Sequence, residues 1–240
     1  IYQINLAIAG IAVGTVSLPI LSIAIKKRNK IEIKKIQNKS LELCLLLSIP
    51  ASVGLILGSE QIVNGLFGYG SFTPKDIEMT SLALKYFGYG IPAFALVKIF
   101  ANLYFARDNT HIPFKLSLII VSLNILISLS FFEKIGFTII PIATSISTWI
   151  GAGTYLLLLV NRDSLKLDNK FLKNIIKIVF STVLMGLILI YCLDFFEQNL
   201  DYSNKFKSIY VLLVVGFVAT IYLISCYLLG VLKIKNYKTN

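Results

Sequence analysis

The chain has 240 residues, 56% of them hydrophobic, and a mean hydropathy of +0.79. A soluble domain of this length could not bury so much apolar surface, so the composition excludes an ordinary soluble protein and indicates a membrane protein. A net charge of +11 beside a membrane is typical of topology signals and of contact with anionic lipid headgroups, so we expect no nucleic-acid partner.

Seven apolar segments are each about long enough to cross a hydrocarbon core of roughly 30 Å, which takes about 20 residues as a helix. The sequence therefore predicts an all-α polytopic membrane protein with seven transmembrane helices. The predicted spans are residues 4–25, 41–58, 79–105, 116–132, 137–160, 175–193 and 209–232.

Basic residues lie almost entirely on one side of these spans. Lys and Arg are retained on the cytoplasmic side of a membrane, so residue 1 is expected outside and Asn240 inside. The opposite side holds Lys75, Lys134, Lys205 and Lys207. The cytoplasmic side is predicted to hold Lys26, Lys27, Arg28, Lys30, Lys34, Lys35, Lys39, Arg107, Lys115, Arg162, Lys166, Lys170, Lys173, Lys177, Lys233, Lys235 and Lys238.

The first span contains a Gly10-x-x-x-Gly14 pair, which allows another helix to approach closely, and then Pro19, which predicts a kink. Residues 26–39 are too polar to span and alternate Ile with Lys and Glu. We expect this segment to lie along the inner surface as a short amphipathic helix.

The turn after the second span is rich in glycine and ends in Thr73-Pro74. This predicts a new helix capped by Thr73, with Pro74 in its first position. Pro92 predicts a further kink. His111, the one histidine, falls in a polar turn with no metal-ligating neighbour and is interpreted as a solvated residue.

No catalytic pattern is present, neither a glycine-rich phosphate loop nor a metal-ligand spacing nor a nucleophile with its base, so we expect no enzyme. Cys44, Cys192 and Cys226 fall in apolar spans at unrelated spacings. They are interpreted as buried thiols rather than as disulfides or zinc ligands.

Lys98 is the outstanding polar residue of the spans. It lies nine residues before Arg107, about 13 Å along a helix, near the middle of the bilayer, where an ionisable group is a functional-site candidate by default. Asn102 shares its face, whereas Lys85 points about 220° away at 100° per residue. Lys98 either lines a polar cavity that receives an anionic substrate or is satisfied by carbonyls or by a partner elsewhere in the protein.

Oxygen-bearing side chains gather on the fourth and fifth spans. Ser117, Asn124 and Ser128 share one face, with Thr144 and Thr148 nearby. Such groups could coordinate a cation, or they could form hydrogen bonds between helices. A charged linker, residues 161–170, then separates five spans from a Leu/Ile/Val-rich pair expected to contact lipid.

Several strings resemble the MurJ (MviN) family of lipid II flippases, in matching order and spacing. These are residues 14–22 (GTVSLPILS), 66–73 (LFGYGSFT), 97–100 (VKIF) and 105–113 (FARDNTHIP). The resemblance covers essentially the whole chain and would correspond to the family's second half, so we expect a fragment whose N-terminal half, including the first helix of the lobe, lies upstream.

The resemblance implies the second lobe of a MATE-like alternating-access transporter (residues 1–160), the cytoplasmic linker (161–170) and two peripheral C-terminal helices (171–240) that form a groove for a lipid tail. It implies translocation of lipid II, the undecaprenyl-pyrophosphate-linked peptidoglycan precursor, from the inner to the outer leaflet of the bacterial cytoplasmic membrane.

The resemblance also implies substrate contacts at Lys98 and Asn102 and no cofactor, with sodium or the membrane potential as the coupling source. Asn124, Ser128 and Thr144 correspond to sodium ligands of some relatives, although Ser128 stands where a carboxylate would be wanted. The alternatives are a polysaccharide-lipid exporter, a cation-coupled drug antiporter or an inert truncated scaffold.

Overall fold

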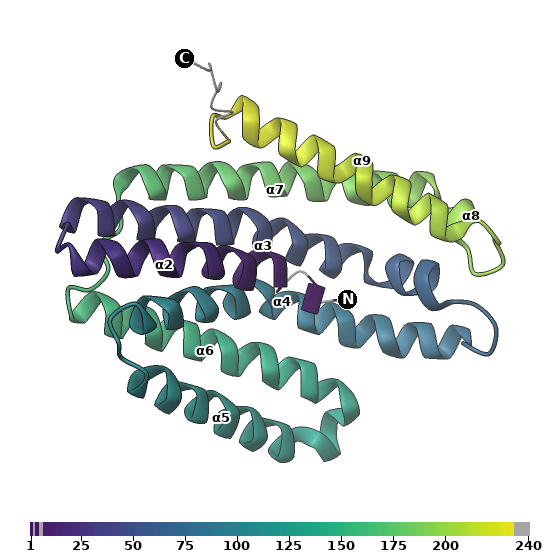
Figure 1. Ribbon diagram of the computed structural model, residues 1–240. Coiled ribbons are helices and arrows are strands. Elements are labelled where there is room, and N and C mark those ends of the chain that lie inside the picture. The colour runs from purple at the N-terminus through teal and green to yellow at the C-terminus, as the bar shows by residue number, and fades with distance from the viewer. Residues whose placement is uncertain (2, 5–6, 233–240) are drawn as a thin grey trace.

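The computed structural model describes residues 1, 3–4 and 7–232, and every regular element in that part of the chain is a helix (Figure 1). The helices run side by side along one axis. They are η1 (Ala7–Ala12, a π-helix), α2 (Val13–Lys26), α3 (Lys30–Phe67), α4 (Pro74–Phe105), α5 (His111–Ile135), η2 (Gly136–Thr138, a 3-10 turn), α6 (Ile139–Asn161), α7 (Asn169–Phe195), α8 (Glu197–Leu200) and α9 (Lys207–Leu228).

Six helical segments in the described residues are long and apolar enough to cross a membrane, and the one at His111–Asn161 has 51 residues. That segment contains two crossings, because α5 and α6 fold back on each other around η2. The reversal depends on Gly136, whose φ of +75° is costly for any residue with a side chain. The seven predicted spans are therefore confirmed.

The prediction of a separate surface helix at residues 26–39 is wrong. After a short turn, α3 begins at Lys30 and continues without a break to Phe67, with Asn29 capping its first turn by accepting a hydrogen bond from the Glu32 amide at 3.2 Å. No glycine or proline interrupts residues 30–49, so nothing in the backbone stops the basic turns from extending the apolar helix.

The predicted cap at Thr73 is confirmed. Its hydroxyl accepts a hydrogen bond from the Asp76 amide at 3.3 Å, while the Asp76 carboxylate accepts one from the Thr73 amide at 2.9 Å. Together these bonds form a capping box with Pro74 at the start of α4. The helix then runs through Pro92 without interruption, as α2 does through Pro19.

Helix α3 lies at the centre of the molecule, with α2, α4 and η1 against one part of it and α7, α8 and α9 against another (Figure 1). The α5–α6 pair packs on the far side of α4. One core lies between α2, α3, α4 and α6, and a second lies between α3, α7 and α9. The three cysteines are free and buried, as predicted: Cys44 in the first core, Cys192 and Cys226 in the second.

Small residues allow the closest helix contacts, as expected where lipid removes any hydrophobic drive between helices. Gly14 of α2 faces the side chain of Asn102 on α4, and Gly151 of α6 faces Ile120 on α5. A methyl group added at either glycine would overlap its neighbour. The predicted close approach at Gly14 is thus made by α4.

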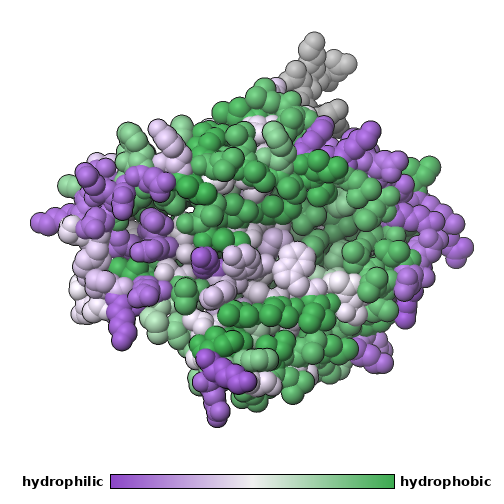
Figure 2. Space-filling view, turned by 180° about the vertical axis from the view of Figure 1, so that it is seen from behind, coloured by the Kyte–Doolittle hydropathy of each residue, from purple (hydrophilic) through white to green (hydrophobic). Residues whose placement is uncertain are grey.

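Hydrophilic residues gather at the two ends of the helices, with hydrophobic surface between them (Figure 2). One end carries the basic turns around residues 26–39, 107–115 and 162–173, and we call it the basic end. Its predicted cytoplasmic orientation remains a prediction. Lys233, Lys235, Lys238 and Asn240, which were part of that prediction, lie outside the described residues.

Candidate functional site

Lys98 is exposed on α4, directly before the buried pair Ile99–Phe100 and seven residues before the helix end at Phe105. In the described part of the chain its ammonium group makes no hydrogen bond and no ion pair. Lys98 lies about 10 Å along the helix from Phe105. Its charge is therefore on an apolar helix, and no described residue neutralises it. The alternative in which backbone carbonyls accept hydrogen bonds from the Lys98 ammonium is therefore not observed among these residues.

Asn102 lies one turn further along α4 and is half-buried against Gly14 of α2. Its amide therefore borders the joint between the two helices, while Lys98 projects further outward. Lys85 is also exposed, on the other face of α4, as the 220° rotation between the two lysines predicts. Lys85 and Lys98 therefore face different surroundings.

The structure brings together the three residues considered as sodium ligands. Asn124 Nδ2 of α5 donates to Thr144 Oγ1 of α6 at 2.9 Å, and Ser128 Oγ donates to Asn124 Oδ1 at 3.2 Å. Thr144 Oγ1 in turn donates to the Ile140 carbonyl at 2.7 Å.

In this arrangement the three side chains satisfy one another, and an amide nitrogen rather than an oxygen faces Thr144. No cluster of three or more His, Cys, Asp or Glu residues suited to a metal occurs in the part of the chain described. The set as arranged does not fit a sodium ion, and it has the hydrogen bonds expected of contacts between helices. The sodium-ligand role stays a prediction.

A second feature of functional interest is an apolar groove of about 350 Å³ between α3, α7 and α9. Its walls come from α7 and α9, including Met185, Leu189 and Val214. Gln61 and Tyr222 are the polar side chains that reach it, and the Tyr222 hydroxyl is already bonded to the Leu46 carbonyl at 2.7 Å. The groove therefore suits a hydrocarbon chain.

The floor of the groove comes from α3, which the sequence interpretation missed. Pro50, Ala51, Gly54 and Gly58 line it, and a methyl group added at Gly54 would meet no atom within 4 Å. The spacing of these small residues along one helix was the signal available in the sequence.

The family model described as "Lipid II flippase MurJ" matches residues 1–212. The chain belongs to the MurJ family. A probable lipid II flippase MurJ of Rhizobium meliloti (strain 1021) is 34% identical over 194 residues, which are 81% of this chain and 36% of that protein. One of Thermotoga maritima is 30% identical over 200 residues, 83% of this chain and 40% of that protein.

A solved structure, lipid II flippase MurJ in an inward closed conformation, aligns with a TM-score of 0.75 at 26% identity. The alignment covers 95% of this chain and 44% of that one, so the chain spans less than half the length of the MurJ proteins it matches. The MurJ family and the apolar helices identify the chain as a multi-pass protein of the bacterial inner membrane.

Proposed function

We propose that this chain supplies one lobe and the tail groove of a lipid II flippase, which moves the lipid-linked peptidoglycan precursor from the inner to the outer leaflet. Family membership sets the class of activity. The observation that carries the proposal is Lys98, an exposed cation on a transmembrane helix without a counter-ion in the described structure.

Lys98 would bind the pyrophosphate of the precursor. A cation in a partly dehydrated cavity attracts a phosphate far more strongly than one in water does, and an intramembrane charge without such a role is costly to retain. Asn102, on the same helix face, would donate a hydrogen bond to the same headgroup. The apolar groove between α3, α7 and α9 would hold part of the polyprenyl tail, because its almost wholly apolar lining can replace the lipid around a hydrocarbon chain without leaving a polar group unsatisfied.

Complementation tests this function. The complete open reading frame that encodes this chain is expressed in cells depleted of their own flippase, with membrane abundance measured in parallel. We expect wild-type rescue, loss of most activity with Lys98→Ala at normal abundance, and partial activity with Lys98→Arg, which keeps the charge in a different geometry. Lys85→Ala is the matched control, since it removes one exposed cation from the opposite face of the same helix.

Normal growth with Lys98→Ala at normal abundance would remove Lys98 from the site. Failure of the wild-type gene to restore lipid II translocation would refute the function and leave the alternatives of another lipid-carrier exporter or an inert scaffold. Sodium as the coupling ion is tested in the same cells by replacing external sodium with potassium, which should abolish rescue only if sodium drives transport.

A further inference from the structure

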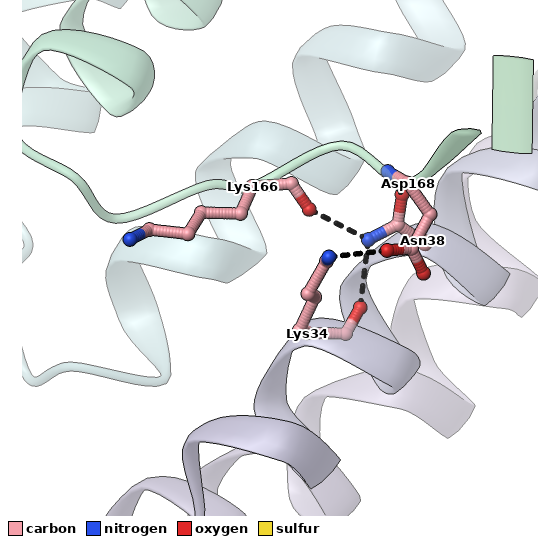
Figure 3. A network of polar contacts seen from close by, with 4 residues as sticks. All are labelled: Lys34, Asn38, Lys166 and Asp168. Atoms are coloured by element: carbon pink, nitrogen blue, oxygen red, sulfur yellow. Dashed lines mark hydrogen bonds and ion pairs between the residues drawn. The ribbon is translucent and has the colours of Figure 1, made fainter.

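The loop between α6 and α7, residues 162–168, is bound to the basic end of α3, and we call it the strap (Figure 3). Asn38 Nδ2 donates to the carbonyls of Lys34 and Lys166, both at 2.8 Å, and Asn38 Oδ1 accepts from the Asp168 amide at 2.9 Å. Lys34 and Asp168 form an ion pair beside it. The amide of Asn38 is thereby almost fully used, and it fixes the end of the strap.

A second set of bonds fixes the middle of the strap. The Ser164 carbonyl accepts hydrogen bonds from Gln37 Nε2 of α3 and from Arg107 Nη2, just beyond α4, both at 2.8 Å. Gln37 is 2% exposed and Leu165 3%. Three segments that are distant in the sequence therefore meet as one rigid structure.

Between these segments lies a pocket of about 370 Å³ with four cationic side chains on its walls. Asp163 is the carboxylate that lines it. The four cations are Lys30, Lys34, Arg107 and Lys166.

The acids near the pocket neutralise only part of this charge. Asp163 pairs with Lys166 at 3.0 Å and Asp168 pairs with Lys34. Lys30 and Arg107 have no carboxylate partner among the described residues, and the Arg107 guanidinium is bonded to the carbonyls of Leu103 and Ser164 alone. Arg107 is half-buried, and this partial removal from water lowers the pKa of its guanidinium. Two positive charges thus remain in excess.

The inner part of the pocket lies at the depth of lipid headgroups, and its outer part extends beyond them. On α3 the lining runs from Gln37, about 6 Å before Leu41, where the apolar part of the helix begins, to Lys30, about 16 Å before Leu41. A phosphate at the membrane surface can therefore reach the Gln37 end of the pocket.

We propose that this pocket binds a phosphate group, supplied by the headgroup of an anionic phospholipid, at the basic end of the bundle. Lys30 and Arg107 provide the unpaired charge, and Lys166 can exchange Asp163 for the phosphate. The site is separate from Lys98 and from the apolar groove.

Isothermal titration calorimetry on the chain in an uncharged detergent at low salt tests the proposal. The probes are dihexanoylphosphatidylglycerol, dihexanoylphosphatidylcholine and inorganic phosphate. We expect the phosphatidylglycerol to bind more tightly than the phosphatidylcholine. Lys30→Gln combined with Lys166→Gln should weaken it about 30-fold, from about 1 kcal/mol for each lysine near an anionic headgroup.

The matched control is Lys170→Gln combined with Lys173→Gln, which removes two exposed lysines from α7 at the same end but outside the pocket. Its affinity should change much less than that of the pocket variant, because neither lysine lines the pocket. Equal weakening by the two double variants, or no binding of any anionic probe, would overturn the proposal.

Asp163→Asn provides a test that misfolding cannot imitate, because it should tighten binding. Asp163 has a φ of +52°, a conformation that asparagine also tolerates, and its removal frees Lys166. Unchanged or weaker binding in this variant would contradict the assignment. Inorganic phosphate that binds with the same dependence on Lys30 and Lys166 would identify free phosphate as a second source of the ligand, whereas binding of the lipid alone assigns the site to a headgroup.

Discussion

Lys207, the first residue of α9, is 1% exposed and is bound by carbonyls rather than by an acid. Its ammonium donates to the carbonyls of Gly68 and Tyr202, both at 2.6 Å, and lies 4.5 Å and 4.3 Å from the ring centres of Tyr69 and Tyr202. Because Gly68 follows α3 directly, this one side chain joins the far end of α3 to the start of α9.

Lys207→Met keeps the length and apolar stem of the side chain and removes the charge. Methionine retains a favourable contact with the two rings, so the main loss is the two hydrogen bonds. At the lower bound of about 1.5 kcal/mol for each bond to a charged group, we expect the free energy of unfolding to fall by about 3 kcal/mol.

The measurement is SDS-induced unfolding in mixed micelles, followed by helical circular dichroism. Lys205→Met is the matched control, since Lys205 lies two residues earlier and is exposed, and it should change stability by less than about 0.5 kcal/mol. Equal stability of the two variants would refute the view that the carbonyl-bound ammonium holds this end of the molecule together.

Three further outcomes are expected. Gly151→Ala should lower the free energy of unfolding by about 1–3 kcal/mol in the same SDS titration, because the added methyl group overlaps Ile120. Gly216→Ala on α9 is the control and should be neutral or stabilising, because its methyl group meets no atom within 4 Å. Equal effects of the two substitutions would contradict the close packing at Gly151. The Thr73 hydroxyl and amide lower the pKa of Asp76, so its carboxylate stabilises α4 fully above the unfolded-state pKa of about 3.9 and stops doing so as the pH falls through the lower, folded-state pKa. The difference in melting temperature between wild type and Asp76→Asn should therefore shrink to zero over that pH range. A difference that does not change with pH would exclude this role of Asp76. In the complete protein in intact cells, single cysteines at the exposed positions Ser71 and Gln198 should react with an impermeant thiol reagent and those at Lys27 and Asn169 should not; the reverse pattern would invert the orientation.

The features predicted correctly from the sequence depend on local signals. The apolar runs fix the seven crossings, and the order Thr73-Pro74 with Asp76 specifies a helix start through bonds within four residues. The rotation of 100° per residue likewise places Lys98 and Lys85 on different faces of one helix.

The features that were missed depend on contacts across long stretches of sequence. Residues 26–39 were predicted to lie flat because of their polarity, but Gln37 and Asn38 are buried by the strap, more than 120 residues away. The groove floor on α3 was missed for the same reason, since the facing walls on α7 and α9 follow about 130 to 170 residues later. Composition shows that such segments are apolar or basic, and only packing shows which of them meet.

The central position of α3 has a mechanical consequence. With 38 residues it is a rod of about 57 Å, and in the described structure the groove helices α7 and α9 touch no other long helix of the bundle. Any displacement felt by α4, where Lys98 lies, therefore reaches the groove through this single rod, with the strap as a tether at one end and Lys207 as a clasp at the other. A tilt of α3 would move α4 and the α7–α9 pair together. Loss of the strap contacts or of the Lys207 contacts would instead let the α7–α9 pair rotate about the axis of α3.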